Sequence, residues 1–462
     1  MNRMKKTRVT APAGKILFVN PWIYDFAAHD FWIKPLGLLY LASILRENGF
    51  HIDFIDCLNP YHPGLQFEKG MKKPVRKYGG HGNFPKEHIP KPAPLSHIPR
   101  YYKRYGITPR LFHEELQRID SPDIIFVTSM MTYWYPGVFE AIRMLREHFR
   151  NVPIVLGGVY ATLCTAHAKK YSGADIVAPG AGECQLAGLI KELLDHELDF
   201  IPGMDNLDSI PYPAFDLVSH LDQVPIETSR GCPFRCSYCA SLIIQCDFIC
   251  RHPIKVVDEI EYWHRNFNVA DFSFYDDALL VHSKDHLVPM LTEIRERNIR
   301  CSFHCPNGLH LKEVNEEISS LMFNTGFKTI RFGFETADAT RQIRTGAKIS
   351  NDETREAIDH LKAAGYKSSD IGVYILCGLP GQHADEVRDS IVFIKSCGAR
   401  PVITEFSPIP GTRLWNQCVE ASPCDIAGEP LFHNNTLMPC RDKSITFEVF
   451  HELKRLTREE FF

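Results

Sequence analysis

Short apolar runs alternate with longer amphipathic segments in the first part of the chain. The run K-I-L-F-V-N (15–20) and the alternating H-I-D-F-I-D (51–56) predict strands, and residues 36–49 between them have helical periodicity. The same rhythm returns in three more strands and the helices that follow them, at 123–128, 137–149, 154–158, 175–178 and from Glu183 onward. Strands that alternate with helices form parallel sheets covered on both faces. Residues 15–199 therefore predict a Rossmann-like, doubly wound α/β domain after a tail of residues 1–14.

A long break interrupts this domain. From Leu58 to about Tyr105 the chain is rich in Pro, Gly, Lys and His and lacks a clear period. Such a stretch is too long for an ordinary connection between a strand and a helix. We predict an insertion over about residues 58–120 that covers a site or a sheet edge.

A second series of strands and helices follows a proline-containing linker at residues 200–225. About six β/α units run without a break through residues 226–415. Consecutive parallel units of this kind predict a partial (β/α)6 barrel of the TIM type, with its chemistry at the C-terminal ends of the strands. Residues 416–462 form a C-terminal extension that carries no motif we can interpret.

Composition and charge narrow the class of protein. With 462 residues the chain has room for two or three domains, and 44% hydrophobic with 23% charged residues is typical of globular proteins. A formal net charge of −4 argues against a nucleic-acid partner held by phosphate contacts. The basic start lacks the apolar core of a secretory signal, and no apolar run is long enough to span a bilayer. We expect a cytoplasmic protein without a membrane partner.

Three of the fifteen cysteines lie in one short stretch, R-G-C-P-F-R-C-S-Y-C. Cys232, Cys236 and Cys239 are separated by three and then two residues, whereas structural zinc sites take four ligands and disulfides take pairs. Three thiolates can hold three irons of a 4Fe–4S cluster and leave the fourth iron open to another ligand. The pairs at 246/250 and 301/305 are possible extra ligands, but both lack the tighter C-x2-C spacing.

This cysteine pattern, with Tyr238 before its last cysteine and a predicted strand before its first, resembles the radical S-adenosylmethionine (SAM) superfamily. The resemblance implies that Cys232, Cys236 and Cys239 bind the cluster and that the open iron chelates SAM. It also implies reductive cleavage of SAM to a 5′-deoxyadenosyl radical, with an external electron donor of the flavodoxin or ferredoxin type.

The ends of later strands resemble the same superfamily. Asp276 and Asp277 in F-Y-D-D-A-L-L stand where the family binds the ammonium group of SAM, and Glu335 in R-F-G-F-E-T stands where it binds the ribose. A carboxylate suits a cation, because hydrogen bonds to charged groups are the stronger class. The alternative is structural: the two aspartates would cap a helix, and Glu335 would form a surface ion pair.

Three further residues complete the cofactor set that the resemblance implies. Arg331 points inward on the strand that carries Glu335, and Gly378 in Y-I-L-C-G-L-P-G would let the backbone approach the adenine. Asn307 in C-P-N-G-L is a third candidate for contact with SAM.

The first domain resembles the cobalamin-binding class of this superfamily. The matching segments are K-P-L-G-L-L-Y-L-A (34–42), L-G-G-V-Y-A-T (156–162) and A-P-G-A-G-E (178–183). Gly157 and Gly158 would let the corrin lie against the backbone, and Glu183 ends the third segment. The motif D-x-H-x-x-G, which supplies a histidine to cobalt, is absent, so the resemblance implies cobalamin without that ligand. The alternative is a retained fold that binds no cobalamin.

Three functional hypotheses follow. The first is a radical SAM enzyme, with cobalamin-dependent methyl transfer to an unactivated carbon of a small molecule or peptide. The second is a radical SAM isomerase, cyclase or sulfur-chemistry enzyme whose first domain only shapes the access of the substrate to the barrel. The third is an iron–sulfur redox or binding protein, which predicts a fourth protein ligand. No G-x-G-x-x-G motif supports nicotinamide binding.

Overall fold

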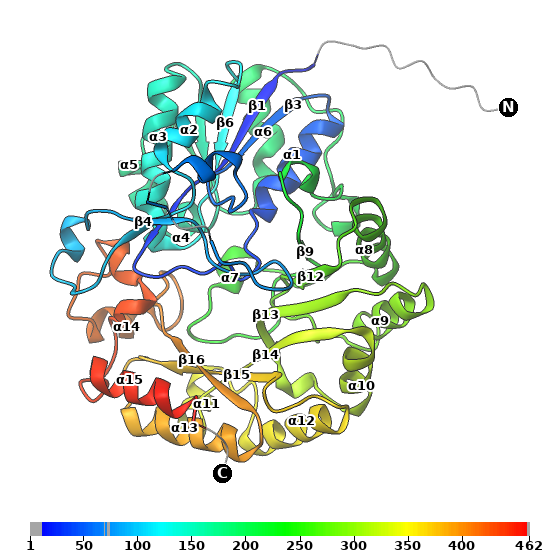
Figure 1. The fold of residues 1–462 in the computed structure, drawn as a ribbon, viewed down its shortest axis with the longest axis vertical. Coiled ribbons are helices and arrows are strands. Elements are labelled where there is room, and N and C mark those ends of the chain that lie inside the picture. Colours follow the sequence, from blue (N-terminus) through cyan, green and yellow to red (C-terminus); the bar gives the residue numbers. More distant parts are fainter. Residues whose placement is uncertain (1–11, 69, 72–73, 460–462) are drawn as a thin grey trace.

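The computed structural model describes residues 12–68, 70–71 and 74–459. Two parallel sheets, each flanked by helices, lie one above the other in Figure 1. The first is built from the N-terminal part of the chain and the second from the part after the linker. This arrangement confirms the predicted fold class.

The first sheet has five parallel strands in the order β3-β1-β6-β7-β8. By sequence rank this is 2-1-3-4-5, a doubly wound order whose direction reverses between β1 and β6. Helices α1 and α6 cover one face, and α2, α3 and α5 cover the other. The strands are β1 (Lys15–Asn20), β3 (His51–Asp56), β6 (Ile124–Val127), β7 (Ile154–Leu156) and β8 (Ile176–Val177). The helices are α1 (Leu36–Glu47), α2 (Pro109–Leu116), α3 (Tyr135–His148), α4 (Val159–Leu163), α5 (Thr165–Tyr171) and α6 (Gly182–Leu194).

The predicted insertion contains more regular structure than its composition indicates. Strands β4 (Lys86–His88) and β5 (Lys103–Tyr105) join β2 (Ile23–Asp25) in a small antiparallel sheet of order β2-β5-β4. Strands of three residues are too short to show a period, which is why sequence reasoning missed them. The insertion also carries α2, and its Gly79 lies against Asp271 and His304 of the second sheet.

The second sheet has six parallel strands in the order β16-β15-β14-β13-β12-β9, so each strand pairs with its successor in the sequence. The series ends at β9 and β16, which makes the barrel partial, as predicted. The strands are β9 (Val224–Ile226), β12 (Asp271–Phe274), β13 (Ser302–His310), β14 (Phe327–Glu335), β15 (Ile371–Cys377) and β16 (Arg400–Glu405). The covering helices are α8 (Pro253–Phe267), α9 (Leu287–Glu296), α10 (Glu316–Thr325), α12 (Asn351–Ala363) and α13 (Ala384–Ser396).

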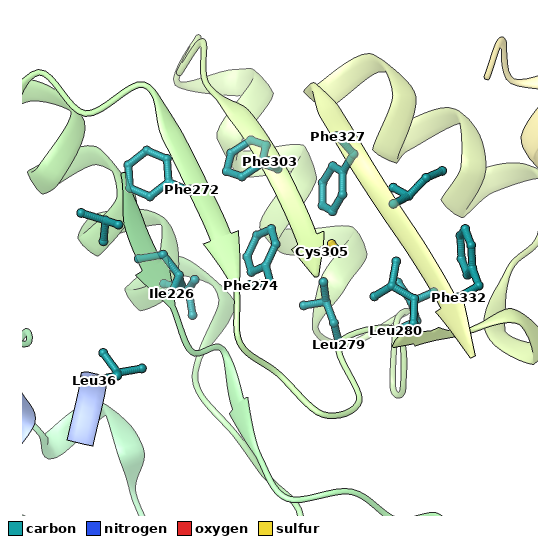
Figure 2. Close-up of a cluster of buried hydrophobic side chains, with 14 of the residues drawn as sticks. Leu36, Ile226, Phe272, Phe274, Leu279, Leu280, Phe303, Cys305, Phe327 and Phe332 are labelled. Atoms are coloured by element: carbon teal, nitrogen blue, oxygen red, sulfur yellow. The ribbon is translucent and has the colours of Figure 1, made fainter. Parts of the chain in front are cut away.

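Aromatic side chains form the core between the second sheet and its helices (Figure 2). The ring centroid of Phe303 on β13 lies 5.6 Å from that of Phe274 on β12 and 5.4 Å from that of Phe327 on β14. Successive side chains of a strand point to opposite faces, so the residues between these phenylalanines point into the barrel interior. The inner positions therefore include polar residues such as Ser273 and His304.

The C-terminal extension joins the two halves. It contains α14 (Trp415–Ala421) and α15 (Phe447–Leu456), with short 3-10 turns at Pro430–His433 and Asn435–Leu437. The amide of Asn434 donates to Asp25 Oδ1 at 2.8 Å, and the ring Nδ1 of His433 lies 2.9 Å from Thr132 Oγ1. Both partners belong to the first half of the chain, so the extension fixes the position of that half against the barrel.

Candidate active site

A cavity of about 420 Å3 lies between the two sheets. From the first half it is lined by Thr128 just after β6, by Gly157 and Gly158 after β7, and by the start of α1. From the second half it is lined by Ser229, Arg230, Ser241, Tyr275 and Asp277. In both halves these positions follow the C-terminal ends of strands, where parallel α/β sheets bind ligands.

The loop that carries the three cysteines opens beside this cavity. It follows β10 (Ser229–Arg230), which pairs antiparallel with the later β11 (Ile249–Cys250), and it ends at α7 (Ser241–Ile244). Gly231 begins the loop with a φ of 80°, and a Cβ there would lie 2.3 Å from the carbonyl oxygen of Asp247. Only glycine fits that position. The Ser237 amide donates to the carbonyl of Thr345 at 3.0 Å, which ties the loop to the segment after β14.

The three thiols are half-buried, free of disulfides, and close enough to influence one another electrostatically. Burial raises the pKa of the Cys232 thiol to about 11, with smaller contributions from Asp277 and the other two cysteines. Burial also raises the pKa of Cys236, where the ammonium group of Lys348 acts in the opposite direction. A thiolate in this loop therefore needs positive charge beside it, which cluster irons would supply.

Glu335 is brought to the cysteine loop from the end of β14. Its carboxylate accepts a hydrogen bond from the Tyr238 hydroxyl at 2.8 Å and forms an ion pair with Lys348. Its φ is 74°, at a register shift between β14 and β15, so the backbone turns this carboxylate away from the ordinary strand path. Glu335 is only 6% exposed, so its ion pair with Lys348 is buried and is not a surface ion pair.

Lys348 is a site residue that sequence reasoning missed. It lies on the loop after α11 (Ala339–Thr345), with its side chain 15% exposed. Burial opposes its charge, but Glu335 and Cys236 raise its pKa above the usual value, so it stays an ammonium ion. The neighbouring Gly346 lets this loop approach, since a Cβ there would lie 3.1 Å from the Cα of Cys236. No motif marks Lys348 in the sequence.

The two aspartates after β12 have different surroundings. Asp276 accepts hydrogen bonds from the amide and hydroxyl of Thr228 and from the hydroxyl of Ser229, at 3.1, 2.6 and 2.6 Å. Asp277 lines the cavity, accepts from Ser241 Oγ at 2.8 Å and lies near Cys232. Burial raises the pKa of both carboxyl groups. Neither aspartate caps a helix, and Asp277 is the one that faces the cavity.

Three other predicted cofactor residues lie outside the cysteine loop's contacts. Asn307 is in an irregular part of β13 and donates to the carbonyl of Tyr275 at 2.9 Å. Gly378 has a φ of 99°, and Met438 of the C-terminal extension lies 3.2 Å from where its Cβ would stand. Arg331 lies in the middle of β14, where the charged groups that influence it are Arg400, Tyr374 and Asp370. The structure therefore does not bring Arg331 to the cysteines.

The two glycines predicted to contact cobalamin, Gly157 and Gly158, differ in the space around them. Gly158 has a φ of 91°, and a Cβ there would lie 2.2 Å from the carbonyl oxygen of Ser129, so the backbone requires glycine. A Cβ at Gly157 would meet only the carbonyl oxygen of Ala178, at 3.7 Å. The space beside Gly157 is therefore open to the cavity.

A buried ion network joins the two halves at the cavity wall. Arg230, two residues before the first cysteine of the triplet, lies 2.9 Å from Glu183 Oε1 of α6 and 2.7 Å from Glu227 Oε2. Its guanidinium also stacks 5.2 Å from the ring centroid of Tyr40 on α1. Burial lowers the pKa of Arg230, but the two carboxylates outweigh this effect and raise the pKa above its usual value. Glu183 therefore positions the cysteine loop against the first sheet.

The donor set fits an iron–sulfur cluster better than a single metal ion. Across residues 12–68, 70–71 and 74–459, no three His, Cys, Asp or Glu side chains converge tightly enough to hold one ion. Three thiols spread around one loop suit a cube, whose irons stand at separate corners. No histidine is among the residues that line the cavity, so the cavity offers no imidazole ligand to a metal.

Comparison with known proteins agrees with this geometry. Residues 226–394 match the family model of the radical SAM superfamily. This part of the chain is a radical SAM domain. The family implies a 4Fe–4S cluster and SAM as cofactors and, in general, an external reductant. The protein is therefore a radical SAM enzyme.

Relatives and solved structures extend the likeness beyond this domain. A protein named an uncharacterized methyltransferase from Pyrococcus horikoshii is 25% identical over 73% of this chain and 76% of its own length. Cytidylyl-2-hydroxyethylphosphonate methyltransferase of Streptomyces wedmorensis is 21% identical over 88% of this chain and 82% of its own. An anaerobic magnesium-protoporphyrin IX monomethyl ester cyclase of Rubrivivax gelatinosus is 22% identical over 67% of this chain and 61% of its own.

Two solved structures share the fold of both halves. The radical SAM methyltransferase TsrM of Kitasatospora setae, with cobalamin and a 4Fe–4S cluster bound, superposes with a TM-score of 0.62 at 16% identity. The match covers 96% of this chain and 90% of TsrM. The cobalamin-dependent radical SAM enzyme OxsB gives a TM-score of 0.59 at 14% identity over 96% of this chain and 56% of its own. Within residues 12–68, 70–71 and 74–459, no helix of this radical SAM enzyme has the length and apolar character to cross a membrane.

Proposed function

We propose that this radical SAM enzyme is a cobalamin-dependent methyltransferase that acts on an unactivated carbon. One observation carries the proposal: a single cavity is lined both by Gly157, at a strand end of the first sheet, and by Asp277, beside the cysteine loop. A methyl carrier and a radical source have to reach the same substrate, and this cavity would hold both. The methyltransferase names among the relatives and the TsrM-like fold support it.

Residues of the barrel would hold the cluster and SAM. In this proposal Cys232, Cys236 and Cys239 bind three irons, and the bound cluster supplies the electron that splits the sulfonium of SAM. The carboxylate of Asp277 binds the SAM ammonium group, since it is the buried acid that faces the cavity. Glu335 binds the ribose hydroxyls while Lys348 and Tyr238 hold its carboxylate in place. Asp276 orients Thr228 and Ser229 at the entry to the loop.

Residues of the first half would hold cobalamin, which when bound supplies the methyl group. Gly157 leaves room for the corrin face, and Gly158 shapes the turn from β7 into α4. Because no lining residue is a histidine, the protein offers no imidazole to cobalt at this cavity. We also propose the boundaries 15–199, 200–225, 226–415 and 416–462 for first domain, linker, barrel and extension, and an electron donor of the flavodoxin or ferredoxin type.

The second candidate is a radical SAM cyclase, isomerase or sulfur-chemistry enzyme without cobalamin. The relative named as an anaerobic magnesium-protoporphyrin IX monomethyl ester cyclase favours it. An iron–sulfur redox protein is the third candidate, and it leaves the cavity beside the cysteine loop without a role.

A single-turnover assay separates these candidates before the substrate is known. Protein reconstituted anaerobically with iron, sulfide and reduced cobalamin is incubated with SAM and dithionite. Methyl transfer from SAM to cobalamin leaves S-adenosylhomocysteine, so we expect this product only when cobalamin is present. Formation of 5′-deoxyadenosine and methionine without cobalamin-dependent S-adenosylhomocysteine would favour the second candidate. Recovery of intact SAM in every condition would favour the third candidate, the iron–sulfur redox protein.

Removal of the Glu335 or the Asp277 carboxylate is expected to weaken SAM binding without loss of the cluster. Glu335→Ala and Asp277→Ala each lose a hydrogen bond to a charged carboxylate, at a cost of about 1–3 kcal/mol in the free energy of binding. Isothermal titration with SAM measures the effect, and the cluster absorbance checks iron content. The exposed Glu356→Ala on α12 is the matched control. Unchanged affinity in both site variants would return these carboxylates to a structural role.

A further inference from the structure

The interior of the partial barrel is divided into two chemically different halves. On the side of β9, β12 and β13, the inward His304 has polar partners on both ring nitrogens. His304 Nε2 lies 2.9 Å from Asp271 Oδ1, and its Nδ1 lies 3.1 Å from Thr329 Oγ1. The ring of Trp32, from the first half of the chain, stacks on His304 at 4.4 Å between centroids, and its indole donates to the carbonyl of Gly79. The first half and its insertion thus fill this side.

On the side of β14, β15 and β16, two arginines face the interior instead. Arg331 of β14 is in register with Gly372 of β15, which is in register with Arg400 of β16. A Cβ at Gly372 would lie 2.6 Å from Arg331 Nη1 and 2.7 Å from its Cδ. The glycine therefore lets the Arg331 side chain lie across β15 toward Arg400.

Neither guanidinium has an acidic partner. Among the residues that the structure describes, neither Arg331 nor Arg400 forms a salt bridge. The single hydrogen bond of the Arg331 side chain goes to the carbonyl of Ile330 at 2.9 Å, and Arg400 Nε is buried without a partner. Asp370 is the one acid that acts on Arg331, but its carboxylate already accepts from the Lys367 amide at 3.0 Å and the Ser369 hydroxyl at 3.2 Å.

This pairing is electrostatically unfavourable without an anion. Burial lowers the pKa of Arg331, and the charge of Arg400 lowers it further. Two like charges in a partly desolvated barrel repel, and each would be stabilised by a shared negative group. Both residues are half-buried, so an anion from solution can reach them.

A cavity lined by Arg400 gives such an anion a route to that residue, which neighbours Arg331 across β15. Its volume is about 750 Å3, and its lining includes the cationic side chains of Lys367, Lys454 and Arg458, with Glu459 as the acid. Cations on an edge strand such as β16 can also serve to prevent pairing with another sheet. That explanation does not apply to Arg331, because β14 is an internal strand of the sheet.

We propose that Arg331 and Arg400 form an anion subsite that binds a phosphate or phosphonate group of the substrate. Two guanidinium groups match a doubly charged tetrahedral oxyanion, which each can bind with two parallel hydrogen bonds. The subsite lies in the barrel interior below the ends of the strands that carry the cysteine loop and Glu335. Its assignment to the substrate rests on the proposed function, whereas anion binding by the two arginines does not.

The test measures binding of inorganic phosphate to the reconstituted enzyme by isothermal titration at constant ionic strength, with acetate as the singly charged comparison. We expect phosphate to bind at one site, and Arg331→Met and Arg400→Met each to weaken it by about tenfold or more. The exposed Arg300→Met is the matched control and should bind phosphate as the unchanged enzyme does. Absence of phosphate binding by the unchanged enzyme, or equal affinity for acetate, would overturn the proposal.

Thermal melting supplies a second measurement that does not depend on SAM chemistry. Without phosphate, Arg331→Met should melt at the same or a higher temperature, because it removes a repelling charge. With phosphate, the unchanged enzyme should gain stability and the two site variants should not. Variants that melt lower in both conditions and still bind phosphate would show that the arginines are structural. Failure of the SAM assay leaves these measurements unaffected, so the two proposals fail separately.

Discussion

Replacement of Cys232, Cys236 or Cys239 by alanine is expected to remove the 4Fe–4S absorbance and all cleavage of SAM, while the fold persists. The three thiols share one loop, and each would hold a different iron, so no neighbouring thiol of the triplet can replace the one that is lost. The loop lies at the rim of the cavity and outside the aromatic core of the barrel, so circular dichroism should change little. Iron and sulfide content, the optical spectrum and 5′-deoxyadenosine formation measure the result.

Two cysteines outside the triplet provide matched controls. Cys246 is exposed beyond α7, and Cys301 lies at the opposite, N-terminal end of β13, beside His264. Alanine at either position should leave iron content and SAM cleavage near those of the unchanged enzyme. A full and active cluster in any one triplet variant would refute the assignment of the ligands.

Gly157→Leu is expected to abolish retention of cobalamin and leave the cluster signal intact. A Cβ at Gly157 has room in the backbone, so the longer side chain should project into the cavity and occupy the space of the corrin. The cysteine loop belongs to the other half of the chain and should keep its iron. Cobalamin that remains with the protein after gel filtration, read from its optical spectrum, measures the effect.

The same experiment has a control and a spectroscopic readout. Gly188→Leu on α6 is matched in chemistry, because that glycine is exposed and its Cβ would have no neighbour within 4 Å. It should retain cobalamin. Bound Co(II) cobalamin in the unchanged enzyme should give a base-off spectrum without nitrogen coupling, because we expect neither dimethylbenzimidazole nor a cavity histidine on the cobalt. An unchanged enzyme that never retains cobalamin, yet cleaves SAM, would contradict the methyltransferase proposal.

Periodicity and local spacing were enough to predict both sheets and the cysteine loop. A strand or helix repeats its apolar pattern over neighbouring residues, so each half shows its β/α rhythm without reference to the other. The three cysteines lie within eight residues, and their spacing is likewise a local property. The short strands of the insertion were not predicted, because three residues are too few to show a period. Their pairing with β2 also joins segments that are distant in the sequence.

The site around the loop depended on contacts that no local pattern records. Lys348 reaches Glu335 only because a positive φ turns the end of β14, and Arg230 joins Glu183 only when the two sheets face each other. The sequence placed Arg331 on the right strand, but its distance from the cysteines and its pairing with Arg400 follow from strand register. Sequence alone determined the elements and predicted the cysteine triplet as cluster ligands, because both patterns are encoded by near neighbours. Tertiary structure decided which charges meet, because those contacts join residues far apart in the chain.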